Sequence, residues 1–457
     1  MAKRNQKAKV KRVDALDQIN LNAAGIDIGA EEVYVAVPGD RDEESVRSFT
    51  TFTVDLQRLA DWLKACQIKT VAMESTGVYW IPLYEILEEN GFDVCLVNAR
   101  HLKNVSGRKT DVLDCQWIQQ LHTYGLLSPS FRPPEEIVAI RSLVRHREML
   151  VQYRSSHIQH MQKALTVMNL RLTNVLSDIT GVTGMNILRS IVAGECDPKK
   201  LAEFRDKRCA KSEAEIIKSL EGHYKPEQVF ILKQALELYD YYDEQLKACD
   251  QQLEELYRQF DPPENPGSPP PAPSNAKRRK NQPHFDLAPA LYQMTGIDLT
   301  QIDGVDTLTI QKVLSEIGTD MSPWPTVKHF TSWLHLAPNN QITGGKVKKK
   351  GVQPTQNRAS TALRIAAASL KRSDSALGAY FRRMRARLGA PAAITATAHK
   401  LARIIYAMLK NHQSYQDVGA DHYEHKYRER IMRNLSRQAA KLGLRLELIP
   451  VAVVEVS

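Results

Sequence analysis

Four acidic side chains, Asp27, Glu74, Asp111 and Asp114, have the residue type and the order of a metal site that acts on nucleic acid. Asp27 lies near the end of the first apolar stretch, and Glu74 closes the apolar run that starts at Thr70. Asp111 and Asp114 are three residues apart, so one helix could present both carboxylates on one face. Carboxylate oxygens suit Mg²⁺, and two such ions can hold a phosphodiester between them. The quartet therefore predicts a site with two Mg²⁺ ions.

Each of these acids has a simpler interpretation when it is taken alone. Asp111, for example, follows Thr110 at an expected helix start, where the helix dipole favours a carboxylate in any protein. The order of the four residues is more specific, because it runs from a first-strand end to a fourth-strand end to the last helix. Four carboxylates gathered without a cation would repel one another and cost stability. The ordered set, more than any one member, predicts the metal.

The elements expected to position the quartet form an α/β domain over residues 20–130. Strands are expected at 23–29, 32–37, 46–52, 70–74 and 92–97, and helices at 56–63, at 83–89 and around the two later aspartates. The order β-β-β-α-β-α-β-α is typical of a ribonuclease-H-like domain, in which helices pack over a mixed sheet.

A second group of reactive residues lies in the segment 339–351, which is expected to be a loop. Thr343 offers a hydroxyl, and Gly344 and Gly345 allow close approach of a backbone. A hydroxyl that attacks phosphorus forms a phosphoester that conserves bond energy for rejoining. A loop that merely contacts phosphate remains the alternative. The expected nucleic-acid-binding residues here and on the next helix are Lys346, Lys348, Lys349, Lys350, Arg358 and Arg364.

The remainder of the chain is expected to be mostly helical. Residues 135–260 predict long coiled-coil helices around a smaller helical insert at 172–225, and the pairing could be an internal hairpin or a contact with another subunit. The best seam is Leu232, Ala235, Tyr239, Tyr242, Leu246, Cys249, Leu253, Leu256 and Phe260. Around it we expect a disordered basic N-terminus at 1–19, a proline-rich linker at 261–287, a helical domain at 288–412 and a basic tail at 413–457.

The charge of the chain is concentrated in its last quarter. The 457 residues carry a net charge of +10, but residues 341–457 contain 22 Lys and Arg against 7 Asp and Glu, a surplus of 15. This asymmetry favours a nucleic-acid-binding C-terminal region over a merely solvated basic surface. The six scattered cysteines fit a reducing cytoplasm, and no apolar run approaches the roughly 20 residues of a membrane span.

Five segments of the chain resemble the DEDD transposases of insertion-sequence family one-hundred-ten. They are 25–29, 73–77, 109–114, 301–305 and 336–347, and the resemblance covers about residues 20–430. It implies a RuvC-like domain, a coiled coil and a C-terminal helical transposase domain. It also implies Mg²⁺-dependent recombination of element and target DNA, guided by a structured bridge RNA, in a homo-oligomeric dimer or tetramer at a prokaryotic nucleoid. Asp27, Glu74, Asp111 and Asp114 match the metal ligands of the family.

The chain departs from the family at one reactive position. A serine of the family becomes joined to DNA, and Thr343 occupies that position here. The threonine hydroxyl is secondary and its branched Cβ restricts rotamers, so attack should be slower. Thr343 is therefore either a working nucleophile or the mark of a weakened copy. Two other functions stay open: a RuvC-like junction nuclease that uses water, and an inactive RNA- and DNA-binding protein.

Overall fold

The structure is a computed structural model that divides into two compact units, Met1–Arg132 and Pro133–Ser457. It describes residues 17–75, 77–98, 111–261, 266, 269–270, 280–344, 346–349 and 351–447, without the side chains of 111–113, 341–342, 347 and 349. The prediction of a mixed sheet with helices followed by a largely helical region is confirmed. No helix in the described part of the chain combines the length and apolarity that crossing a membrane requires.

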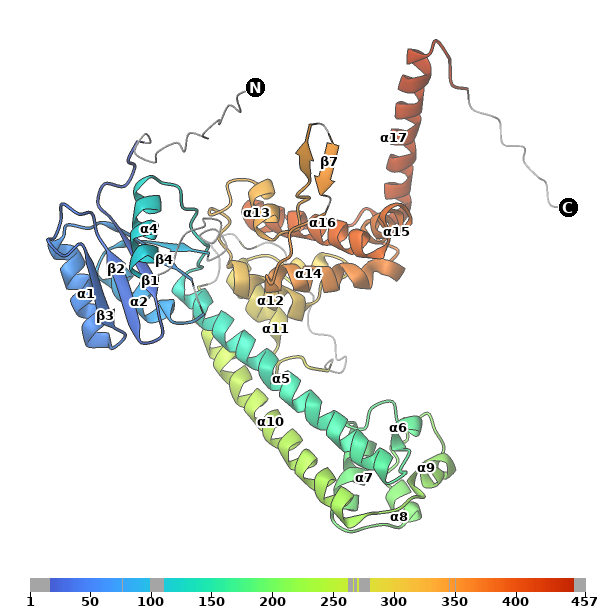
Figure 1. Cartoon of the computed structure of the whole chain (residues 1–457). Helices are drawn as coiled ribbons and strands as arrows, with labels where there is room; N and C mark the ends of the chain where they lie inside the picture. The colour runs from blue at the N-terminus through green and yellow to red at the C-terminus, as the bar shows by residue number, and fades with distance from the viewer. Residues whose placement is uncertain are drawn as a thin grey trace, which may run out of the picture. The chain divides into compact units, whose positions relative to one another are not determined.

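The first unit is built on a five-stranded mixed sheet (Figure 1). Its elements are β1 (Ala23–Ile28), β2 (Glu32–Ala36), β3 (Val46–Thr50), α1 (Thr53–Ala65), β4 (Thr70–Glu74), α2 (Trp80–Glu89), β5 (Asp93–Val97) and α4 (Asp111–Thr123). The strand order is β3-β2-β1-β4-β5, with β1, β4 and β5 parallel and β2 and β3 antiparallel. Every expected strand is therefore present, within about two residues of its expected bounds.

The two faces of the sheet differ because successive residues of a strand point to opposite sides. Ala24, Ile26 and Ile28 of β1 are buried in the main core of this unit, which includes the apolar residues of α1 and α2. The other face of β1 carries Gly25 and Asp27, and α4 packs on it. The acidic residue is thus part of the face that α4 covers.

The second unit begins with two long helices, α5 (Glu135–Val167) and α10 (Pro226–Arg258), which lie side by side (Figure 1). Arg147 pairs with Asp250, and Arg154, later in α5, pairs with Asp243, earlier in α10, so the helices run antiparallel. Between them in sequence lie four shorter helices, α6 (Leu172–Val175), α7 (Val182–Val192), α8 (Pro198–Ala202) and α9 (Glu213–Leu220). These two helices thus pack on each other within one chain.

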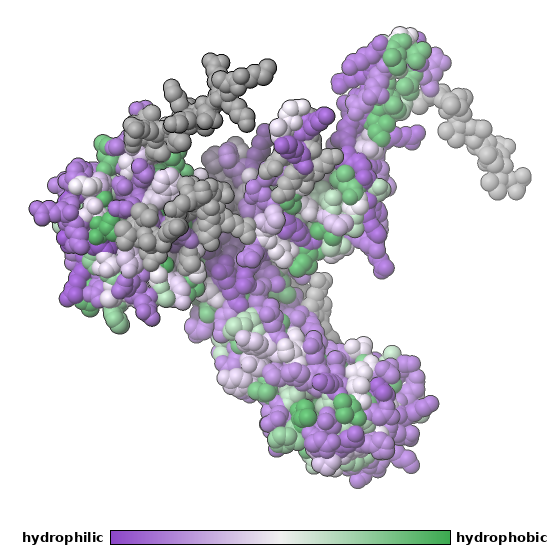
Figure 2. All heavy atoms as spheres, in the orientation of Figure 1, coloured by the Kyte–Doolittle hydropathy of each residue, from purple (hydrophilic) through white to green (hydrophobic). Residues whose placement is uncertain are grey.

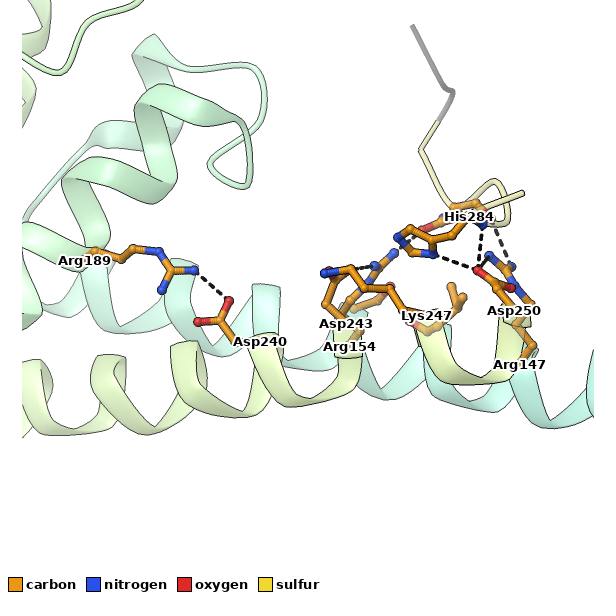
Figure 3. A network of polar contacts seen from close by, with 11 residues as sticks. Arg147, Arg154, Arg189, Asp240, Asp243, Lys247, Asp250 and His284 are labelled. Carbon is orange, nitrogen blue, oxygen red and sulfur yellow. Dashed lines mark hydrogen bonds and ion pairs between the residues drawn. The ribbon is translucent and has the colours of Figure 1, made fainter. Parts of the chain in front are cut away.

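Polar pairs replace apolar contacts at part of this helix–helix interface (Figure 3). Arg147 Nε donates to Asp250 Oδ1 at 2.5 Å, and Asp250 is only 1% exposed. Asp250 also accepts from the His284 backbone N–H at 2.9 Å, and Arg147 donates to the Asn281 carbonyl at 3.0 Å. The pair therefore joins the segment around Asn281 and His284 to both long helices.

The remainder of the second unit is helical apart from one hairpin. Its elements are α11 (Leu287–Thr295), η2 (Leu299–Gln301), α12 (Thr307–Ile317), α13 (Val327–Trp333), β6 (Gln341–Thr343), β7 (Lys346–Lys349), α14 (Arg358–Ser369), η3 (Leu370–Arg372), α15 (Ala376–Leu388), α16 (Ala390–Asn411) and α17 (Gly419–Lys441). Arg145 of α5 forms a two-bond ion pair with Glu316 of α12, and Arg141 donates to the carbonyls of Ser315 and Glu316. Arg141 thus satisfies carbonyls that the helix end leaves without a partner.

Two segments differ from their expected structure. The expected loop 339–351 contains the antiparallel hairpin β6–β7, because a glycine pair allows a tight turn between short β-branched stretches. The basic tail forms the helix α17 from Gly419 to Lys441, and no residue of α17 is buried. Figure 2 shows apolar side chains along one side of this helix, and Ile431, Leu435 and Leu442 are exposed.

Candidate active site

Asp27 and Glu74 lie at the ends of two neighbouring parallel strands. Ile26 of β1 is in register with Met73 of β4, so the two acids that follow are one step further along the same pair. Strand alternation turns both acidic side chains to the face that α4 covers. Both residues are half-buried. The first two members of the quartet are therefore neighbours at one end of the sheet, where β1 and β4 finish.

The direction of α4 brings its first turn to the same end of the sheet. Near the helix end, the Thr123 carbonyl accepts from the Asn20 backbone N–H at 2.9 Å, ahead of the start of β1. Gln119 Nε2 donates to the carbonyl of Ala23, the first residue of β1, at 3.4 Å. The helix consequently runs antiparallel to β1. Its N-terminal turn, which carries Asp111 and Asp114, lies toward the carboxyl end of β1.

Gly25 sets how closely α4 approaches the sheet. A Cβ atom at this position would lie 2.1 Å from the backbone nitrogen of Gln119 and 2.4 Å from the carbonyl oxygen of Cys115. From Cys115 to Asp111 the helix axis advances about 6 Å. From Gly25 to Asp27 the strand advances about 6.6 Å. Both advances lead to the same end of the sheet, so the first turn of α4 lies toward the end of β1 that carries Asp27.

The pKa of the Cys115 thiol is affected by the acidic residues around it. Its pKa is raised to about 12, chiefly by burial and to a smaller extent by the carboxylates of Asp27 and Asp114. Both acids therefore lie close enough to the same buried thiol to act on it. This electrostatic link joins β1 and α4, two elements that are far apart in the sequence.

The donor set of this site fits a divalent cation, because three elements contribute carboxylates to one end of the sheet. Among the side chains that the structure describes, no three acidic, histidine or cysteine groups are close enough to hold a metal ion as they stand. The side chain of Asp111 is not among them, so the complete quartet cannot be assembled from the described atoms. The assignment of Asp27, Glu74, Asp111 and Asp114 as metal ligands stays a prediction.

Thr343 lies beside the turn of the β6–β7 hairpin in the second unit. It pairs with Lys346 across the turn, and both residues are exposed. Gly344, next to Thr343, has φ of 55°, in the left-handed region that favours glycine. The hydroxyl thus stands at an exposed tip that a nucleic-acid backbone can approach.

The expected nucleic-acid-binding residues fall into three groups. Lys346 and Lys348 are exposed on the hairpin, the side chain of Lys349 is not described, and Lys350 lies outside the described residues. Arg358 begins α14 and pairs with Glu148 of α5 at 2.7 Å, so an acid already balances its charge.

Arg364 lies further along α14 and is half-buried, and burial lowers its pKa. The assignment of all these residues as nucleic-acid contacts stays a prediction. Lys346 and Lys348 are the most accessible of those whose side chains are described.

Gly25 and Cys115 are the residues that the reading of the sequence missed. The signal for Gly25 was present, because a glycine inside a buried strand often marks the close approach of another backbone. No comparable signal exists for Cys115, whose role depends on the helix register against β1.

Two comparisons with known families cover both candidate sites. A family model described as Transposase, for the DEDD transposases of IS110, matches residues 24–169. A second model, described as Transposase IS116/IS110/IS902 family, matches residues 298–382. The first range contains the acidic quartet and the second contains Thr343. No curated protein matches the chain.

Proposed function

Because this chain belongs to the IS110 family of transposases, we propose that it cuts and exchanges DNA strands with Mg²⁺ held by Asp27, Glu74, Asp111 and Asp114. The DEDD type of the family implies a divalent metal, and two Mg²⁺ ions are our specific proposal. The observation that carries the proposal is the register of β1, β4 and α4. It places Asp27 and Glu74 on adjacent strand ends, opposite the helix turn that bears the two later aspartates.

In this proposal the protein groups have separate tasks. Bound Mg²⁺ would supply charge neutralisation at the scissile phosphate. Asp27 and Glu74 fix their oxygens on a rigid sheet, since β1 and β4 are central strands. The first turn of α4 brings further carboxylates to the same place. Sheet and helix together hold the ligands in fixed positions, as a catalytic site requires.

Thr343 is proposed as the nucleophile of the transposase domain. Its Oγ1 would form a bond to phosphorus while the bond from phosphorus to one deoxyribose oxygen breaks. The hydroxyl proton leaves Thr343, and the sugar oxygen leaves with a proton as a free hydroxyl, so the step balances. The resulting phosphothreonine conserves the bond energy that rejoining needs. The exposed position of Thr343 beside the hairpin turn supports this role.

The second candidate is a nuclease that uses water at the acidic site. The replacement of the family serine by Thr343 favours it, because a branched secondary alcohol is a poorer nucleophile. The two functions differ in their product. Attack by Thr343 gives a protein–DNA adduct that survives denaturation, whereas attack by water gives only free ends.

The partners in this proposal are the ends of the mobile element, a target DNA and a structured bridge RNA, in a dimer or tetramer. The positive surplus of residues 341–457 supports binding of nucleic acid. Copurification followed by RNA sequencing would identify the guide. If the protein still exchanges strands after complete removal of RNA, the proposal of RNA guidance is wrong. The assignment of the acidic site would not be affected by that result.

The acidic site is tested with Asp27→Asn, which keeps the shape of the side chain and removes its charge. We expect loss of Mg²⁺-dependent strand cleavage and loss of the rise in melting temperature that Mg²⁺ gives the wild type. The matched control is Asp61→Asn, since Asp61 is an exposed acid of α1 on the other face of the sheet. Unchanged cleavage in Asp27→Asn would refute the assignment.

A further inference from the structure

A cavity of about 700 Å³ lies in the second unit beside α16. Its wall is formed by one face of that helix, by Tyr380 of α15 and by the segment that follows α16 as far as Tyr415. The second family model ends at residue 382, so most of this wall lies outside the matched ranges. Neither Thr343 nor any predicted nucleic-acid-binding residue lines this cavity.

The polar wall of the cavity is positively charged. His399, Lys400, Arg403 and Lys410 line it from α16, and no Asp or Glu does. These positions share one side of the helix, opposite the buried side that contains Leu401 and other apolar residues.

Lys400 and Arg403 form no ion pair with any acid in the described part of the chain, whereas Arg383 on α15 pairs with Glu424. The pKa of Lys400 is lowered first by burial and then by Arg403. Two uncompensated cations held together favour an anion from outside the chain.

Aromatic rings accompany the cations. The Lys400 ammonium lies 4.7 Å from the ring centre of Tyr380, which holds it in position. Tyr415 is half-buried, lines the same cavity and is tethered by its hydroxyl, which donates to Asp417 at 3.2 Å. Tyr406 is buried, and its hydroxyl donates to the carbonyl of Trp324. Tyr380 is also half-buried, but its ring faces the Lys400 ammonium, so Tyr415 is the better placed of the two half-buried rings to stack on a base.

We propose that this groove binds a single-stranded segment of nucleic acid, with Lys400 and Arg403 on its phosphates and Tyr415 stacked on a base. Unpaired bases can stack on aromatic side chains, whereas bases in a duplex already stack on each other. Free phosphate would need only the cations, and an acidic peptide would not need the ring. This inference rests on the proposed transposase function and adds a strand-binding site outside the two reactive centres.

The test uses the full-length protein and fluorescently labelled oligonucleotides of one sequence, as single-stranded DNA, single-stranded RNA and duplex DNA. Lys400→Gln and Arg403→Gln should each weaken single-strand binding roughly tenfold and reduce the salt slope by about 0.7. Tyr415→Leu should weaken binding about as much without changing the salt slope. Tyr415→Phe keeps the stacking ring and loses only the hydrogen bond to Asp417, so it should retain most of the affinity. Tighter binding of RNA or of DNA identifies which strand the groove prefers, and either supports the proposal.

The matched control is Arg385→Gln, because Arg385 is an exposed arginine of α15 that does not line the cavity. Equal weakening in this control, or loss of duplex binding alone, would overturn the proposal. So would equal affinity for polyglutamate with no effect of Tyr415→Leu. Melting temperatures identify any variant that fails to fold. If Tyr415→Leu is such a variant, Tyr415→Phe still tests whether an aromatic ring at this position is sufficient for binding. Asp27→Asn should still bind the oligonucleotide, so a failure of the acidic site is distinguished from a failure of the groove.

Discussion

The backbone of Gly25 in β1 lies against the backbone of Cys115 in α4, with no room for a Cβ atom between them. This contact sets the height of α4 on the sheet. Asp27 follows Gly25 in β1, and the first turn of α4 lies on the same side of this contact, so the contact sets how closely the two elements bring their acidic residues together. A residue without a side chain thus determines where the proposed ligands stand.

Gly25→Val should therefore affect stability and activity together. The new Cβ would meet the nitrogen of Gln119 at 2.1 Å, so α4 must move away from β1. We expect a loss of about 1–3 kcal/mol in the free energy of unfolding, measured by urea denaturation, and loss of Mg²⁺-dependent cleavage. Gly39→Val is the control, because nothing lies within 4 Å of a Cβ added there. Full cleavage activity in Gly25→Val would show that helix height does not matter.

Substitutions of Thr343 should change chemistry without changing stability. The side chain is exposed, so Thr343→Ser and Thr343→Val should alter the free energy of unfolding by less than about 0.5 kcal/mol. Thr343→Ser should increase the amount of protein–DNA adduct seen on denaturing gels, because a primary hydroxyl is less hindered. Thr343→Val should abolish it. An adduct that persists in Thr343→Val would place the nucleophile elsewhere.

The strands of the first unit could be predicted from the sequence to within about two residues. Strands such as β2, Glu32–Ala36, alternate apolar and polar residues, and Thr70–Glu74 is an apolar run of strand length, so local patterns were sufficient. The alignment of Asp27 with α4 could not be predicted in the same way. It depends on a backbone contact between residues 90 positions apart, and sequence periodicity contains no information on such a register.

The second unit shows where local patterns fail. The seam pattern included Leu256, but Leu256 is only half-buried. The next residue, Tyr257, is buried and accepts a hydrogen bond from Gln311 of α12. The partners of the buried Arg147, which are Asp250 and the carbonyl of Asn281, could not be identified from spacing. The expected loop at 339–351 contains a hairpin. The glycines indicated the turn, but the pairing of β6 with β7 on its two sides could not be recognised from such short stretches.

The raised pKa of Cys115 predicts a loss of stability at high pH. The unfolded thiol loses its proton near its ordinary pKa of 9.0, whereas the folded thiol keeps it up to about 12. The unfolded state therefore binds fewer protons in this window, and stability falls as pH rises through it. Cys115→Ser has no such group, so its stability relative to the wild type should improve above pH 9. Urea denaturation below and above pH 9 would measure this, and parallel curves for the two proteins would contradict it.

The buried ion pair between Arg147 and Asp250 joins α5 and α10. Asp250 is 1% exposed, so Asp250→Asn leaves the buried Arg147 charge without an acid. We expect a loss of about 3–5 kcal/mol in the free energy of unfolding. The control is Asp240→Asn, which breaks the exposed pair with Arg189 and should cost no more than about 1 kcal/mol.

Replacing both partners separates charge burial from packing. Arg147→Met combined with Asp250→Leu removes the unpaired charge together with its partner, so the double variant should recover much of the stability lost in Asp250→Asn. The backbone N–H of His284 still loses its acceptor, which keeps recovery incomplete. Urea denaturation of the wild type, the double variant and its two single variants, Arg147→Met and Asp250→Leu, gives the coupling between the two positions. If the double variant is as unstable as Asp250→Asn, the pair holds the segment around His284 in place and the charge balance is secondary.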